Sequence, residues 1–274
     1  MSDLSNAAGR QHGLITSAQA TRLGVTEAAL AHLEESQLVK PLEWDVYQLA
    51  GSPLGPIHAY PYAAWLATAP DLFASERPEP AADVVLSHES ACNVHGMGSL
   101  AIPFVTFTAP EEREAPRATR LTVAPLTAAE VTVSRGVPVT TPHRTILDLV
   151  RSHVDHDDVA EALTDAVQQD LVDLRALHDD LATLADEYGL PAKPPAFADR
   201  FLAELDAASL SLRNLRACAA LRHPDQVAEV RRGVTRVLAE ARGGTGAEDA
   251  LAPEDDELSW DLAAEIVART GTGA

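Results

Sequence analysis

The sequence has 274 residues, of which 46% are hydrophobic, and a formal net charge of −20. This length predicts at least two domains, and the negative charge excludes binding to nucleic acid through the overall electrostatic field, because phosphate groups would be repelled. Two cysteines exclude a disulfide framework. The amino-terminal residues and the apolar runs predict neither a signal sequence nor a membrane span, so we expect a cytoplasmic protein with no membrane partner.

The first fifty residues predict a winged helix-turn-helix. Thr16 or Ser17 can cap a short helix, Gly24 can take the left-handed turn that ends it, and Thr26 begins a second helix. Two segments with strand character follow, the second over 46–49. Helix, glycine turn, helix and two-stranded ribbon are the order of this DNA-binding fold.

The second helix of such a fold enters the major groove, and the ribbon, or wing, contacts the DNA backbone. Here that helix carries Glu27, Glu34 and Glu35 and no lysine or arginine. Two interpretations therefore stay open, a DNA-binding domain and a winged helix that contacts proteins, because base contacts need phosphate contacts to position them. The residues that we expect to contact operator DNA are Arg10, Arg22, Thr26, His32, Gln37 and Lys40.

The middle of the chain predicts an α/β domain. A short strand over 83–87 leads into a helix that Ser87 caps and Gly96 ends, and apolar residues alternate over 101–141 as in strands. Pro142 then begins another helix. The other expected elements are a short helix over 63–67 in the proline-rich segment 52–82, a helix capped by Asp157 or Asp158, a helix over 174–187, a linker over 190–197, and two helical segments over 198–242 divided at Pro224.

The carboxy-terminal part holds most of the negative charge, with a net −13 over residues 151–274. Residues 243–257 are small, acidic and glycine-rich, which predicts a disordered linker. A final helix places Leu258, Leu262 and Ile266 on one apolar face. We expect this tail to dock on the body of the protein or on a partner.

The segment 87–98, SHESACNVHGMG, concentrates residue types that bind metals. On a helix His88, Cys92 and His95 would share one face, and zinc accepts these ligands. Structural zinc sites use four ligands from at least two elements, however, and Cys218 lies far away in the sequence. We therefore expect no metal, no cofactor and no catalytic residue, with Cys92 as a small buried side chain. A hydrolase or metalloenzyme built around His88 and His95 is the alternative.

Residues 151–158, RSHVDHDD, match part of the metallohydrolase pattern H-x-H-x-D-H. His153, Asp155 and His156 fit, but Arg151 stands in place of the first histidine. The segment joins two predicted helices, whereas the pattern follows a strand, so we expect a solvated helix cap. The sequence contains no G-x-S-x-G elbow and no phosphate-binding glycine loop, and we expect no enzyme.

Five arginines give residues 113–144 the densest basic run of the middle region. Such a run can form a local surface for phosphate groups or for an acidic partner. Ordinary salt bridges with Glu111, Glu112 and Glu114 are the equal alternative. The residues that we assign to partner binding are Arg113, Arg117, Arg120, Arg135 and Arg144.

The order of several motifs resembles the AbiEi-type antitoxin family. At the amino terminus these motifs are G-L-I-T-x-x-Q-A at 13–20, L-G-V-T at 23–26 and V-Y-x-L at 46–49. In the middle they are L-S-H-E-S-A at 86–91, H-G at 95–96 and G-V-P-V-T-T-P-x-R-T-I-L-D-L at 136–149. The resemblance runs from about residue 9 to about residue 185, and PLEWDV stands where the family has an arginine- and glycine-rich wing.

This resemblance implies a bacterial antitoxin of the AbiE, type IV, class. The amino-terminal domain of such proteins represses a shared promoter by binding inverted repeats. The second domain counters a nucleotidyltransferase-like toxin encoded beside it, and direct contact with the toxin is not always needed. On this analogy the helix from Thr26 reads DNA, and the arginines of 113–144 belong to the antitoxin surface.

We therefore expect an α+β protein with a winged helix-turn-helix over 1–51, an α/β antitoxin-like domain over 52–187 and a helical extension with an acidic linker over 188–274. Its expected role is a non-enzymatic, antitoxin-like transcriptional regulator of a toxin–antitoxin or abortive-infection operon. The alternative is a protein-interaction module that has lost DNA binding. Inside the second domain we expect Glu89 to pair with Arg144.

Overall fold

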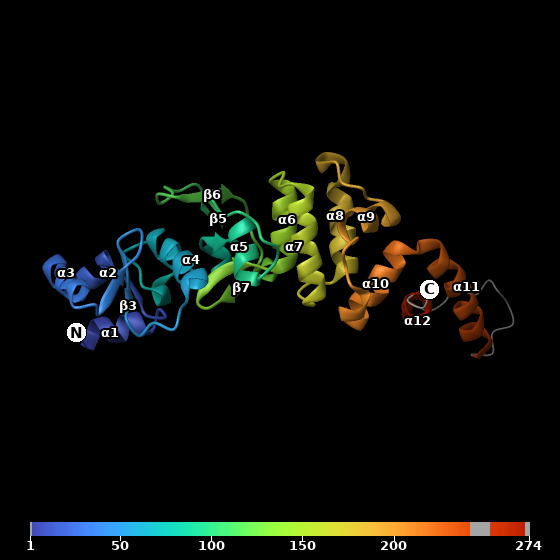
Figure 1. The fold of residues 1–274 in the computed structure, drawn as a ribbon, viewed down its shortest axis with the longest axis horizontal. Helices are drawn as coiled ribbons and strands as arrows, with labels where there is room; N and C mark the ends of the chain where they lie inside the picture. Colours follow the sequence, from blue (N-terminus) through green and yellow to red (C-terminus); the bar gives the residue numbers. More distant parts are fainter. Residues whose placement is uncertain (1, 242–252, 272–274) are drawn as a thin grey trace. The chain divides into compact units, whose positions relative to one another are not determined.

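The computed structural model describes residues 2–241 and 253–271 and is a mixed α+β structure (Figure 1). The chain divides into two compact units, Met1–Leu149 and Val150–Ala274. This boundary falls inside one helix, α6 (Pro142–Arg151), and does not coincide with the predicted boundaries at residues 51 and 187.

Helix α1 and strand β1 were not predicted, and the elements after them follow the predicted order. Thr16 caps α2 in a capping box with Gln19, and Thr26 caps α3 by accepting a hydrogen bond from the backbone of Ala29. Gly24 joins the two helices at a φ of +78°, a conformation open to glycine. The elements are α1 (Ser2–Gly9), β1 (Leu14–Thr16), α2 (Ser17–Arg22), α3 (Glu27–Glu35), β2 (Val39–Pro41) and β3 (Val46–Leu49), with the strands in one antiparallel sheet of order β1-β3-β2.

The rest of unit 1 is built on a five-stranded mixed sheet of order β6-β5-β4-β8-β7. The central pair β4 and β8 is parallel, as are β5 and β6, while β4–β5 and β7–β8 are antiparallel. The predicted strand and helix around Ser87 are present, and Gly96 ends the helix at a φ of 71°. The elements are α4 (Pro56–Ala67), η1 (Ala74–Glu76), η2 (Pro80–Ala82), β4 (Val85–Leu86), α5 (His88–His95), β5 (Val105–Ala109), β6 (Thr119–Val123), η3 (Ala128–Glu130), β7 (Val131–Ser134), β8 (Val137–Thr140) and α6.

Helix α4 is longer than the predicted segment 63–67. Pro56 occupies its first turn, where a proline loses no hydrogen bond, and the helix also accommodates Pro61 in its interior. Nearly every residue from Ala59 to Leu66 is buried. A helix that is apolar on all sides shows no amphipathic period, which is why the sequence pattern missed its first two turns.

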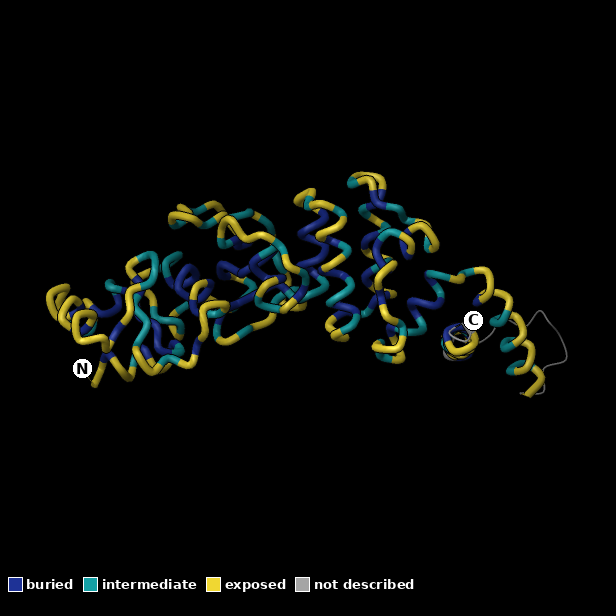
Figure 2. The backbone as a smooth tube through the Cα atoms, in the orientation of Figure 1, coloured by how far each residue is buried: buried dark blue, intermediate teal, exposed yellow. Residues whose placement is uncertain are grey.

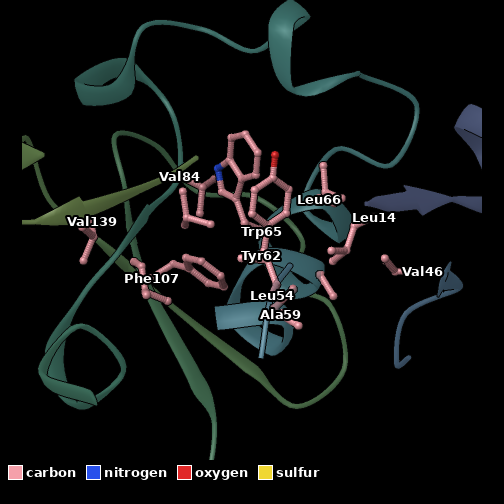
Figure 3. Packing of buried hydrophobic residues seen from close by; sticks show 14 of the residues in the cluster. Leu14, Val46, Leu54, Ala59, Tyr62, Trp65, Leu66, Val84, Phe107 and Val139 are labelled. Carbon is pink, nitrogen blue, oxygen red and sulfur yellow. The ribbon is translucent and has the colours of Figure 1, made fainter. Parts of the chain in front are cut away.

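One hydrophobic core joins the two predicted domains of unit 1 (Figure 3). Leu14 and Val46, from the amino-terminal sheet, belong to the same buried cluster as Tyr62 of α4 and Phe107 of β5. Tyr62 and Trp65 meet edge to face with ring centroids 5.5 Å apart. The amino-terminal segment also has a cluster of its own around Leu30, so residue 51 divides the chain without dividing the core that Leu14 and Val46 share with α4.

Unit 2 contains helices only, within the residues that the structure describes. Asp155 caps α7, so the prediction that Asp157 or Asp158 does so is wrong; Asp157 donates its backbone N–H to Asp155 instead. The predicted linker over 190–197 ends early because Pro194 starts a helix. The elements are α7 (His156–Gln168), α8 (Leu174–Tyr188), α9 (Pro194–Phe201), η4 (Ala207–Ser209), α10 (Leu212–Arg222), α11 (Pro224–Ala241) and α12 (Pro253–Gly271).

The last helix differs from its prediction in two ways. Helix α12 begins at Pro253, so residues 253–257 are helical, while residues 243–252 lie outside the described part of the chain. Its inner face consists of small residues such as Ala263. Leu258, Leu262 and Ile266 share a face as expected, but their side chains are 37–44% exposed. In Figure 2 the helices of unit 2 carry both buried and exposed stretches. Within residues 2–241 and 253–271, no helix combines the length and hydropathy needed to cross a membrane.

Candidate functional site

Helix α3 presents an acidic surface to solvent. Leu30 and Leu33 anchor it in the core beneath. Its exposed residues include Glu27, Glu34 and Glu35, and His32 lies 4.0 Å from the carboxylate of Glu35. Gln37 follows the helix at a φ of 57°, and the Thr26 hydroxyl is committed to capping. This face offers polar contacts but no lysine or arginine.

Arg22, the predicted phosphate contact on α2, is paired within the protein. Its guanidinium donates to both oxygens of Glu76, at 2.7 and 2.9 Å, and also to the carbonyl oxygen of Asp71. It lies over the ring of Phe73, 4.8 Å from the centroid. The bidentate bond from Arg22 lowers the pKa of Glu76 to about 2. Glu76 therefore engages the guanidinium that was predicted to contact phosphate.

Residues 70–76, the segment that carries Glu76, are held beside α2 by hydrogen bonds to two buried glutamines. We call this segment the strap. Gln19 donates to the carbonyl oxygen of Leu72 at 2.6 Å, and Gln11 accepts from the backbone N–H of Ala74 at 2.7 Å. The Thr16 hydroxyl also donates to a carbonyl of this segment, at 2.6 Å. Both glutamines are almost fully buried, so the strap has fixed partners and belongs to the fold.

The two remaining predicted DNA contacts, Arg10 and Lys40, are exposed. Arg10 follows α1 and lines a pocket of about 480 Å³ together with Phe73 and Glu76. Lys40 lies on β2 opposite Gln48 of β3. Lys40 is therefore the cation that the β2–β3 ribbon presents.

The tip of that ribbon is held against the second half of unit 1. Trp44 and Asp45 form its turn at φ values of 62° and 52°, a left-handed conformation that costs about 1–3 kcal/mol for each such residue. The indole N–H of Trp44 donates to the carbonyl oxygen of Arg117 at 2.5 Å, and the Arg117 side chain pairs with Glu43. The Trp44 ring also meets Tyr60 of α4 edge to face, with centroids 5.4 Å apart. These contacts fix the strained turn.

Below this turn lies a groove of about 310 Å³, which we call the wing groove. It runs between α4, α5 and the segments that flank β5 and β6. Sequence reasoning did not identify it, because its walls come from five separate stretches of the chain and no local pattern brings them together. Its main lining side chains are Trp44, Ile57, Tyr60, Ile102, Phe104 and Arg117.

The five arginines assigned to partner binding do not all meet at one patch. Arg113 and Arg117 lie in the β5–β6 connection, and Arg120 follows on β6, stacked on Phe104. Arg135 lies in the tight β7–β8 turn at a φ of 46°. Arg113 approaches Glu111 at 3.9 Å, which matches the salt-bridge alternative for that residue.

Arg144 is a structural residue of α6. Its Nε donates to Asp148 at 2.7 Å and its Nη1 to Glu130 at 2.6 Å, and its side chain is 10% exposed. The prediction that Glu89 is its partner is wrong, since one helical turn places Asp148 directly beside it. Burial opposes ionisation of Glu130, but hydrogen bonds from Thr127 and then from Arg144 lower the pKa of this carboxyl below its usual value.

The cluster around His88 is buried. The Ser87 hydroxyl accepts from Thr108 at 3.0 Å and lies 2.8 Å from Nδ1 of His88, so Ser87 stands at the start of α5 without capping it by its side chain. His95 bonds the Thr140 carbonyl oxygen at 2.8 Å. Burial raises the pKa of the Cys92 thiol to about 12. These groups brace the sheet, and among the described residues no three His, Cys, Asp or Glu side chains are placed to hold a metal.

The RSHVDHDD segment forms the start of α7 in unit 2. Asp155 is the helix cap and His156 the first helical residue, which agrees with the predicted helix cap. His153 stacks near Tyr188, with centroids 5.1 Å apart, and Asp157 pairs with Arg200 at 2.8 Å. These residues line a shallow pocket of about 450 Å³.

No protein-family model matches the sequence, and no curated protein matches it. Function therefore has to be inferred from the residues and their geometry.

Proposed function

We propose that this protein is a DNA-binding, antitoxin-like transcriptional regulator of a bacterial toxin–antitoxin or abortive-infection operon, acting in the cytoplasm. The observation that carries the proposal is the succession β1–α2–α3–β2–β3, with two short capped helices joined at Gly24 beside an antiparallel sheet of order β1-β3-β2. A winged helix has this arrangement, with α3 as the reading helix and the β2–β3 ribbon as the wing.

The second half of unit 1 supports the antitoxin assignment through its sequence motifs. The residues that resemble the AbiEi family are 86–96 and 136–149. They lie in β4, α5, β8 and α6, and β4 and β8 are neighbouring parallel strands of one sheet. Ser87 and Cys92 are at most 1% exposed, which supports a non-enzymatic role because a nucleophile must reach its substrate. The proposed partners are operator DNA and a nucleotidyltransferase-like toxin.

The contacts available to DNA are few. With Arg22 paired to Glu76 and α3 acidic, Lys40 and Arg10 are the cations left to neutralise phosphates. Each phosphate contact contributes about −0.9 to the slope of log K against log salt concentration. The proposed binding is therefore modest and lost at high salt.

A gel-shift titration on the DNA upstream of the gene tests this proposal. The sequence has only two lysines, Lys40 on the wing and Lys193 in unit 2, and both are exposed. We expect Lys40→Ala to weaken the shift and to reduce its salt slope by about 0.9, while Lys193→Ala leaves both unchanged. No shift by the wild type at 50 mM salt would refute DNA binding.

A second candidate is a protein-interaction module without DNA binding. The acidic face of α3 favours it, since Glu27, Glu34 and Glu35 repel phosphates but complement a basic partner surface. Co-purification with the product of a neighbouring toxin gene is the test. Glu34→Lys with Glu35→Lys would abolish that association under this candidate. The same double variant would strengthen the gel shift under the first proposal.

A further inference from the structure

Exposed apolar side chains of unit 1 gather along the wing groove. Ile57 is 55% exposed, Tyr60 44%, Phe104 41% and Ile102 37%, and all four line this groove. Single exposed apolar residues are common on protein surfaces, but several that converge on one concave site indicate a binding function.

The walls of the groove are held by contacts within the protein. Trp44 keeps a left-handed backbone because its indole N–H is bonded to Arg117 and its ring packs on Tyr60. Pro56 and Pro61 on α4 line the same side. A rigid aromatic wall lowers the entropy that a ligand loses on binding, as in most small-molecule sites.

The charges around the groove favour an anion. Glu43 and Arg117 are the charged residues of its lining, and they neutralise each other in an ion pair. Arg120 is not part of this lining, but its guanidinium lies 5.1 Å from the centroid of Phe104, which is. Among the described residues Arg120 has no carboxylate within ion-pair distance. Arg120 is therefore the cation beside this groove with which a negatively charged group could pair.

We propose that the wing groove binds a small organic anion that has an apolar body of about two fused rings and one carboxylate. The body lies between Tyr60, Ile57 and Phe104, and the carboxylate pairs with Arg120, whose planar guanidinium suits it. The site goes beyond the proposed regulation of an operon and does not depend on it. Because Trp44 belongs to the wing, such a ligand would also contact the element that faces DNA in the proposed function.

Isothermal titration of the full chain with three matched probes, without DNA, tests the site. The probes are 1-naphthoate, neutral 1-naphthamide and cationic 1-naphthylmethylamine, which share one ring system and differ in charge. We expect 1-naphthoate to bind once per chain and at least tenfold more tightly than the amide. The amine should bind most weakly.

Three variants locate the binding. Arg120→Gln should remove the preference for the carboxylate and leave the affinity for 1-naphthamide unchanged. Ile57→Ala should weaken naphthoate and naphthamide alike. Ile266→Ala, which shortens an isoleucine of similar exposure on α12, is the matched control and should change nothing.

Three results would overturn the proposal. The first is that naphthoate does not bind, or binds no more tightly than the amine. The second is that the preference for the carboxylate survives Arg120→Gln. The third is that Ile57→Ala and Ile266→Ala change the affinity equally. The gel shift of the wild type is scored separately, so a failure of DNA binding leaves the groove proposal intact, and the reverse also holds.

Discussion

We predict that Arg144→Met lowers the free energy of unfolding of unit 1 by about 3 kcal/mol, because Arg144 is a buried structural cation. Methionine keeps the apolar stem but removes the bonds to Asp148 and Glu130. The Asp148 side chain is 4% exposed, and removing one member of a buried ion pair costs about 3–5 kcal/mol. The lower end applies because Asp148 makes further interactions and Glu130 can be partly solvated.

Urea unfolding followed by tryptophan fluorescence measures this loss. Trp44 and Trp65 lie in unit 1 and Trp260 in unit 2, so a Trp260→Phe background restricts the signal to unit 1. Arg135→Met is the matched control, because Arg135 is exposed in a turn, and we expect it to stay within about 0.5 kcal/mol.

A second variant distinguishes the cost of leaving the Asp148 carboxylate buried without Arg144 from the cost of lost packing. Adding Asp148→Leu to Arg144→Met removes the carboxylate that has lost Arg144, and we expect the double variant to recover part of the free energy of unfolding. A loss below about 1 kcal/mol for Arg144→Met, or a loss equal to that of Arg135→Met, would refute the assignment of Arg144 as a buried brace.

Three further outcomes follow from the structure. Glu76→Gln should release Arg22 for DNA phosphates, which would strengthen the gel shift and steepen its salt slope by about 0.9. Cys92 should stay unreactive toward a thiol reagent at pH 8 until urea unfolds the chain, because burial raises the pKa of its thiol to about 12. Burial lowers the pKa of both His88 and His95, so the unfolded chain binds protons that the native chain does not; the urea midpoint should therefore fall as pH drops below about 6.5.

Each outcome has a result that contradicts it. A gel shift that Glu76→Gln leaves unchanged, in a protein whose shift depends on Lys40, would mean that the strap does not compete with DNA. Rapid labelling of Cys92 in the native protein would place α5 at the surface. A urea midpoint that stays constant between pH 7.5 and 5.5 would show that His88 and His95 titrate alike in the folded and unfolded chain.

Features set by neighbouring residues could be predicted from the sequence. The cap at Thr26 and the left-handed Gly96 follow from local backbone chemistry and were placed correctly, and Thr16 was one of two candidates for the first cap. The amphipathic spacing of Leu258, Leu262 and Ile266 was also correct, but spacing does not say which of two faces a helix buries. The smaller side chains of α12 pack inward, which sequence periodicity alone does not reveal.

Features set by distant pairs could not be predicted. Arg22 and Glu76 lie 54 residues apart, and Trp44 meets Arg117 across 73. No local signal marks either pair, because charged residues and exposed aromatics occur throughout such a sequence. Both pairs bear on the proposed function, since the first engages an arginine predicted to contact phosphate and the second holds the turn between β2 and β3.

The shared core of unit 1 limits how this protein can be recombined with others. Leu14 of β1 and Val46 of β3 are 0% exposed, and α4 packs against both strands. A fragment of the protein that ended at residue 51 would expose these side chains to water, and we expect it to be incompletely folded and prone to aggregate. The segment proposed to read DNA is thus not an independent folding unit, and it can be transferred to another protein only together with the sheet beside it.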